Sequence, residues 1–145
     1  MKTFKIFMLS LLVTTFAMAQ DLKTSDLPMA VSDAFAQGNA NATDVEWKKD
    51  SDNYKVEFDM GRMEHEIWYS ASGEVVKKEQ DIAASELPQA IKDSIKSKYP
   101  DHRIDDVEMK WANNETTYEV ELEKGKEDWK LVFDPNGMIV HERRD

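Results

Sequence analysis

Tyr54-Lys55-Val56-Glu57-Phe58 and Tyr118-Glu119-Val120-Glu121-Leu122 are the two stretches that decide the fold. Each alternates a large apolar residue with a charged one, the period-two pattern of a strand with one buried and one wet face. Each leads to a Gly-basic turn, a second apolar strand and a glycine turn that ends at Gly73 or Gly137. Because the stretches begin 64 positions apart, at 54 and 118, the sequence predicts a duplicated sheet-forming unit.

A helix is predicted ahead of each set of strands. Leu27-Pro28 and Leu87-Pro88 open two amphipathic segments, in which a proline near the first turn costs no hydrogen bond. Strands joined by short turns must pair antiparallel, because a parallel pair needs a long crossover. The predicted class is α+β: two tandem repeats of one helix and a four-stranded antiparallel sheet (αβ4-αβ4), with the helices on one sheet face and the other face exposed.

The same alternation sorts side chains between the two faces of the sheet. Trp47, Trp111 and Trp129 fall on the helix side, where we expect the core. The other side receives mostly acidic residues, and Trp68 falls among them. Two interpretations of Trp68 remain open: an indole exposed on a charged face, or one buried by a loop, a bulge or the other repeat.

Residues 1–19 have the features of a secretory signal peptide. Lys2 and Lys5 precede an apolar run over residues 6–16, and Ala17-Met18-Ala19 is a typical cleavage site. The run is too short to span a bilayer, which takes about 20 residues. We therefore expect cleavage after Ala19, a soluble periplasmic or secreted product with no membrane attachment, and two repeats at 20–82 and 83–145.

Composition restricts the partners of the expected product. The chain has no cysteine, which excludes disulfides and a lipidated cysteine. Loss of Lys2 and Lys5 leaves 19 − 2 = 17 basic against 29 acidic residues, a net charge of −12. Such a surface repels nucleic acid and anionic membranes, so neither is an expected partner.

No motif for catalysis or phosphate binding can be assembled from this sequence. The three histidines are scattered, and all five glycines stand alone. Asp50-Ser51-Asp52-Asn53 begins like a calcium-binding loop, but Tyr54 and Lys55 stand where an oxygen ligand and the turn glycine are required. We expect no cofactor and no enzyme activity, with Ca²⁺ at Asp50 and Asp52 as an open alternative.

The twin Leu-Pro helix starts, the twin Tyr-x-Val-x-Phe/Leu strands and the closing glycine turns resemble the PepSY-like, β-lactamase-inhibitor-like proteins secreted by Bacteroidota. The resemblance covers the whole expected product. It implies two αβ4 units whose sheets form one continuous or side-by-side surface. PepSY-type modules are associated with peptidase regulation, and the inhibitor-like fold grips its target with the uncovered sheet face. Fold similarity alone does not identify the target.

The first hypothesis for function is a non-enzymatic protein-binding module, with inhibition or regulation of a hydrolase or peptidase as one role. Trp68 would lie at the centre of the contact, since interface hot spots favour tryptophan with a polar rim. The residues expected around it are Glu57, Glu66, Glu119, Glu121 and Lys130. The alternative is a calcium- or cation-responsive periplasmic protein, and the partner's identity stays open.

Overall fold

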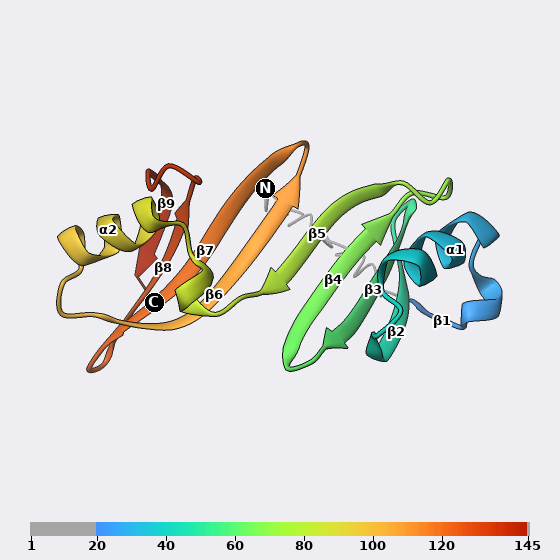
Figure 1. Cartoon of the computed structure of the whole chain (residues 1–145), viewed down its shortest axis with the longest axis horizontal. Helices are drawn as coiled ribbons and strands as arrows, with labels where there is room; N and C mark the ends of the chain where they lie inside the picture. The colour runs from blue at the N-terminus through green and yellow to red at the C-terminus, as the bar shows by residue number, and fades with distance from the viewer. Residues whose placement is uncertain (1–19, 145) are drawn as a thin grey trace, which may run out of the picture.

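The computed structural model describes residues 20–144, which form one nine-stranded antiparallel sheet and two α-helices (Figure 1). The strands follow one another across the sheet in chain order. Their bounds are β1 Gln20–Leu22, β2 Thr43–Asp50, β3 Asn53–Met60, β4 Met63–Tyr69, β5 Val75–Asp81, β6 Arg103–Ala112, β7 Glu115–Lys124, β8 Glu127–Phe133 and β9 Ile139–Arg144. The helices are α1 Met29–Gly38 and α2 Gln89–Lys98.

Both helices cover the same face of the sheet. The register aligns Ile67 of β4 with Lys78 of β5, and Lys78 with Trp111 of β6, so these side chains share one face. Ile67 packs with α1 in one apolar cluster. The α2 cluster includes Val107, which lies four residues before Trp111 on β6 and therefore shares its face. Within residues 20–144, no helix covers the opposite face of the sheet.

Each helix begins directly after its Leu-Pro pair and packs across a glycine turn of its own half. Gly73, between β4 and β5, and Gly137, between β8 and β9, both have positive φ angles, +82° and +84°. A Cβ atom at Gly73 would lie 2.4 Å from the carbonyl oxygen of Ala30 in α1, and one at Gly137 would lie 2.4 Å from that of Ala90 in α2. The absence of a side chain is therefore what allows each helix to approach its turn.

Two separate apolar clusters form the core, one under each helix. The buried members of the first are Val31, Trp47, Val56, Phe58, Ile67 and Tyr69. Those of the second are Leu87, Ile91, Ile95, Val107, Val120, Leu122, Leu131 and Phe133. The clusters share no residue, so the two halves are joined by the β5–β6 pairing rather than by a common core.

The α+β class is confirmed, and the number and length of strands are corrected. The two predicted four-stranded sheets do not include β1, which pairs with β2 and whose Leu22 packs against the first cluster. The fourth strand of the first repeat, β5, runs on to Asp81, because β6 supplies it with a partner. Trp111 lies on the expected face but in neither cluster.

The predicted signal peptide lies outside the described residues. Within residues 20–144, neither α1 nor α2 has the length and apolar character of a bilayer-crossing helix.

Candidate functional site

Neighbouring strands β3 to β7 carry acidic side chains on the face opposite the helices, which we call the carboxylate face. These residues occupy alternate positions along each strand, because successive side chains point to opposite sides. The pairing of strands then brings like charges together. Asp81 lies opposite Glu108, Glu108 lies opposite Glu119, and in the next row Glu66 lies opposite Glu79. Directly opposed like charges destabilise a sheet, so this arrangement has an energetic cost.

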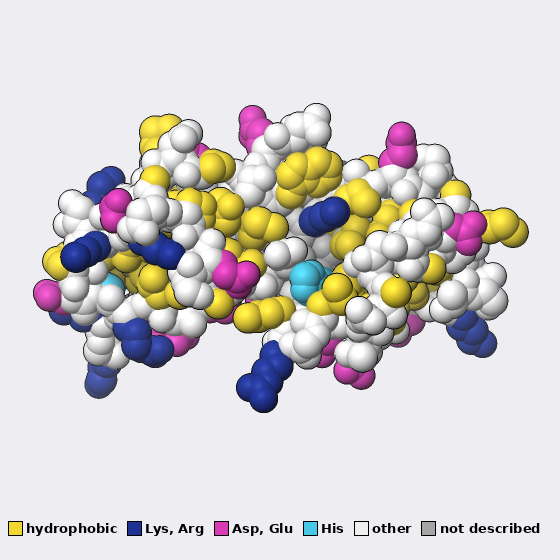
Figure 2. All heavy atoms as spheres, viewed as in Figure 1, with side chains coloured by type: hydrophobic (Ala, Val, Ile, Leu, Met, Phe, Trp, Pro, Cys, Tyr) yellow, Lys and Arg dark blue, Asp and Glu magenta, His cyan; other side chains and the backbone are white. Residues whose placement is uncertain are grey.

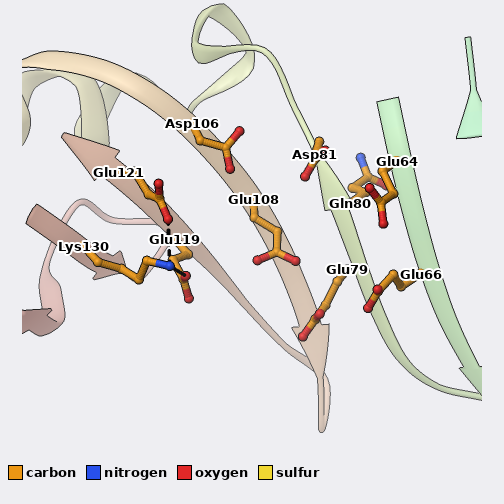
Figure 3. A pocket seen from close by; sticks show the side chains of 10 residues that line it. All are labelled: Glu64, Glu66, Glu79, Gln80, Asp81, Asp106, Glu108, Glu119, Glu121 and Lys130. Atoms are coloured by element: carbon orange, nitrogen blue, oxygen red, sulfur yellow. Dashed lines mark ion pairs between the residues drawn. The ribbon is translucent and has the colours of Figure 1, made fainter. Parts of the chain in front are cut away.

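A recess of about 240 Å³ lies on the carboxylate face where β5 meets β6. Figure 3 shows the side chains that line it, which come from β4, β5, β6, β7 and β8. They are Glu64, Glu66, Glu79, Gln80, Asp81, Asp106, Glu108, Glu119, Glu121 and Lys130. Eight of the ten are carboxylates, and Lys130 is the only amine among them. The recess therefore has a negative potential that favours cations.

Lysines hold the carboxylates on either side of the recess. Lys55 reaches Glu57 at 2.7 Å and Glu66 at 2.9 Å, and Lys48 reaches Glu57 at 2.8 Å. The hydrogen bonds from Lys48 and Lys55 hold the pKa of Glu57 below its ordinary value. These contacts therefore favour the ionised form of Glu57.

The same kind of network occupies the second half. Lys110 lies 3.0 Å from both Glu108 and Glu119, and Lys130 lies 3.2 Å from Glu119 and 2.7 Å from Glu121. Burial raises the pKa of Glu119, but the hydrogen bonds from Lys110 and Lys130 outweigh it, so the pKa is lowered.

One end of the recess is different, because the three carboxylates there form no ion pair within the part of the chain that the structure describes (Figure 3). None of the ion pairs formed within residues 20–144 includes Glu64, Asp81 or Asp106. Burial and then the charge of Asp81 raise the pKa of Glu64. Burial and then the charge of Asp106 raise the pKa of Asp81. Figure 3 shows Asp81 and Asp106 apart from the Lys130 amine, which pairs with Glu119 and Glu121.

Comparison with models of known protein families identifies the family of this chain. A family model described as "Putative beta-lactamase-inhibitor-like, PepSY-like" matches residues 14–73 and again residues 52–141. The chain belongs to the PepSY-like family. This confirms the resemblance derived from the twin strands and helix starts. A comparison with curated proteins found no match.

Solved structures share the fold of this PepSY-like chain. A BLIP-like protein from Bacteroides fragilis is 26% identical, with a TM-score of 0.65 over 81% of this chain and 86% of that one. A putative periplasmic protein from Bacteroides eggerthii is 19% identical, with a TM-score of 0.68 over 81% and 88% of the two chains. A DUF2874 family protein from Bacteroides uniformis is 20% identical, with a TM-score of 0.67 over 81% of this chain and 88% of that one.

Trp68 of this PepSY-like protein lies on the carboxylate face, and of its two open interpretations the structure supports the covered indole, because the residue is only 7% exposed. The reason is its row in the sheet, where Lys55 and Lys77 are its cross-strand neighbours. Their amines lie 4.8 Å and 4.1 Å from the indole ring centroid. The indole Nε1 also donates a hydrogen bond to Asp50 Oδ2 at 2.7 Å. Trp68 is therefore a covered part of the sheet surface.

The other residues expected at the contact all lie on the carboxylate face. Glu66, Glu119, Glu121 and Lys130 line the recess, whereas Glu57 lies beyond it in the Lys48–Lys55 network. The predicted contact did not include the other six lining residues, which are Glu64, Glu79, Gln80, Asp81, Asp106 and Glu108. An extension of the period-two pattern from Lys77 to residue 81 would have found two of them.

The open calcium alternative concerned Asp50 and Asp52, at the β2–β3 turn of this PepSY-like chain. Asp50 accepts the Trp68 hydrogen bond, and the turn places Ser51 at a φ of +53°. Within residues 20–144, no group of three or more His, Asp or Glu side chains is arranged to hold a metal ion.

Proposed function

We propose that this PepSY-like protein is a non-enzymatic binding module of the cell envelope that docks another protein on its carboxylate face. The observation that carries this proposal is the recess with Glu64, Asp81 and Asp106, whose charges no ion pair within the described chain balances. A partner that places cationic side chains there is attracted to these carboxylates. Its charges also offset the repulsion among the carboxylates in the free protein.

The proposed partner presents arginine or lysine side chains on a basic or mixed-charge surface. The flanking lysine networks hold the surrounding carboxylates in place, so the face is ordered before the partner arrives, which lowers the entropic cost of binding. Because Trp68 is covered, the centre of the proposed contact lies at the recess, and Glu57, Glu66, Glu119, Glu121 and Lys130 form its surroundings.

The comparisons support this proposal at the level of the fold. The family description is inhibitor-like, and the B. fragilis structure is of a BLIP-like protein. Inhibition or regulation of a hydrolase or peptidase is therefore the role we propose for the docked state. A periplasmic or secreted location after cleavage at Ala19 is part of the proposal, supported by the signal-like residues 1–19 and by the similar fold of the B. eggerthii protein described as a putative periplasmic protein.

We also propose that the chain arose by duplication, with repeats at 20–82 and 83–145. Support comes from the element order, in which α1 precedes β2 to β5 and α2 precedes β6 to β9, and from the matched glycine turns at 73 and 137. The calcium- or cation-responsive alternative gains no support from the described residues.

The test uses two double neutralisations with the same change of charge. Asp81→Asn/Asp106→Asn alters the recess, and Asp33→Asn/Asp93→Asn alters the two helices on the other face. Partner captured from envelope extract with the wild-type bait is then titrated against all three proteins. We expect affinity to fall at least fivefold for the recess variant and to stay unchanged for the helix variant, since only the former removes charges that face the partner.

Equal affinities of the recess variant and the wild type would reject the carboxylate face as the docking surface. Added salt gives a second measurement, because attraction between exposed charges is screened with a Debye length of about 8 Å at physiological ionic strength. We expect binding to weaken as salt rises, and less steeply for the recess variant.

A further inference from the structure

The helix side of the sheet has a second recess, at the position where neither helix reaches. Its lining consists of Val75, Lys78, Gln80, Met109, Trp111 and Thr116, and its volume is about 330 Å³. It lies over the β5–β6 pairing, on the opposite side of the sheet from the carboxylates. Figure 2, viewed from the helix side, shows hydrophobic side chains gathered in the middle of the molecule between the two halves.

In the described range 20–144, two α-helices pack on a nine-stranded sheet, and the recess is the part of the helix-side face that neither helix covers. Each helix packs over its own cluster, held by the glycine turns at 73 and 137. Trp111 and Met109 of β6 face the helix side but belong to neither cluster. Both side chains are therefore only half-buried, and part of their apolar surface lines the recess at the join between the two cores.

One row of the sheet sets the chemistry of this recess. Trp111 lies between Lys78 of β5 and Thr116 of β7, its cross-strand partners. Among the residues of 20–144 that line the recess, Lys78 is the only charged one, and none is a carboxylate. Lys78 also takes part in none of the ion pairs formed between described residues, unlike Lys77 next to it.

We propose that this recess binds a small amphiphilic carboxylate, with its aromatic or aliphatic part on Trp111 and Met109 and its carboxylate on the Lys78 amine. The positive charge of Lys78 in the lining is complementary to an anion. The carboxylate face, on the other side of the sheet, would repel an anion. A volume of about 330 Å³ is at the small end of ligand pockets, which span about 300–1,000 Å³, so the site suits a small molecule. This proposal does not depend on the carboxylate face.

The test compares two probes that share a phenyl ring and a four-carbon chain, 4-phenylbutyrate with a charged carboxylate and 4-phenylbutanol with a neutral hydroxyl group. Both are titrated into protein expressed from the full-length chain, and the indole N–H signals of the four tryptophans are followed by NMR. A Trp111→Phe variant assigns the Trp111 signal. We expect a saturable shift of this signal and at least threefold tighter binding of the acid than of the alcohol.

Two lysine variants give the matched control. Lys78→Ala removes the amine from the recess, whereas Lys126→Ala removes one from the distant β7–β8 turn. We expect the preference for the acid to disappear in the first and to persist in the second. The proposal is overturned if the Trp111 signal does not saturate, if both probes bind the wild type equally, or if Lys78→Ala keeps the preference.

Discussion

At the scale of single residues, His102 shows a buried polar group that the fold leaves unsatisfied. Both of its ring nitrogens are buried, and neither has a hydrogen-bond partner among the described residues. Its ring packs edge-on against Tyr99, with centroids 5.3 Å apart. A buried polar atom without a partner carries a desolvation penalty of about 1–3 kcal/mol.

We predict that His102→Leu stabilises the protein by about 1 kcal/mol, because it keeps the apolar contact and removes the unsatisfied nitrogens. Urea denaturation followed by circular dichroism measures the free energy of unfolding. His141→Leu, at an exposed position of β9, is the control and should change it little. A lower stability of the His102 variant would mean that this imidazole finds a partner in solution.

Trp68 gives a second prediction at this scale. Trp68→Ala should lower the free energy of unfolding by about 3 kcal/mol. The change removes the indole ring on which the Lys55 and Lys77 side chains pack, and it leaves Asp50 without its hydrogen-bond donor. Trp68→Phe keeps most of the packing and should cost only about 1 kcal/mol for the lost hydrogen bond. If the alanine variant unfolds like the wild type, the indole is not buried as described.

At the scale of secondary-structure elements, the fold depends on two places where a helix lies directly on a turn. We predict that Gly73→Ala or Gly137→Ala destabilises the protein by more than about 2 kcal/mol, since each adds a clash at 2.4 Å to the strain of a positive φ. Thermal unfolding measures the effect.

Gly61→Ala and Gly125→Ala are the matched controls. These glycines have φ angles of +69° and +68°, but nothing lies within 4 Å of a Cβ built there. They should therefore cost only the backbone strain, about 1 kcal/mol. Equal losses at all four positions would show that backbone strain, and not helix packing, makes Gly73 and Gly137 necessary.

At the scale of the whole molecule, two sets of carboxylates give opposite pH dependences. The pKa values of Glu64, Asp81 and Glu108 are raised, mainly by burial, so these groups bind protons more readily in the folded state. Their charged forms therefore destabilise the fold above the folded pKa, and stability rises as pH falls through it. The pKa values of Glu57 and Glu119 are lowered, so their contribution is lost at still lower pH.

We predict that stability is greatest in mildly acidic solution and not at neutral pH. Asp81→Asn should raise the free energy of unfolding at pH 7 by about 0.5 kcal/mol, because it removes one of two directly opposed like charges. It should also flatten the rise on acidification. Urea midpoints between pH 4 and pH 7 measure both effects. A midpoint of Asp81→Asn at or below that of the wild type at pH 7 would contradict the repulsion.

Most of the fold could be predicted from local patterns. The period-two alternation at Val56 and Phe58 placed these residues in the core, and the glycine turns at 73 and 137 were located from sequence. The candidate site was predicted less completely. Glu66 and Glu119 were assigned to the correct face, but Asp81 and Asp106 were missed because they meet only where β5 pairs with β6.

The sequence by itself determined the two helices, the positions of strands β2 to β9 and the face on which each of their side chains lies, because these follow from periodicity and from glycine and proline positions. Only the tertiary structure decided which residues meet across strands, because the lateral register between distant segments is not encoded locally. That register covers Trp68 with two lysines, brings the unpaired carboxylates together and leaves Trp111 open beside Lys78.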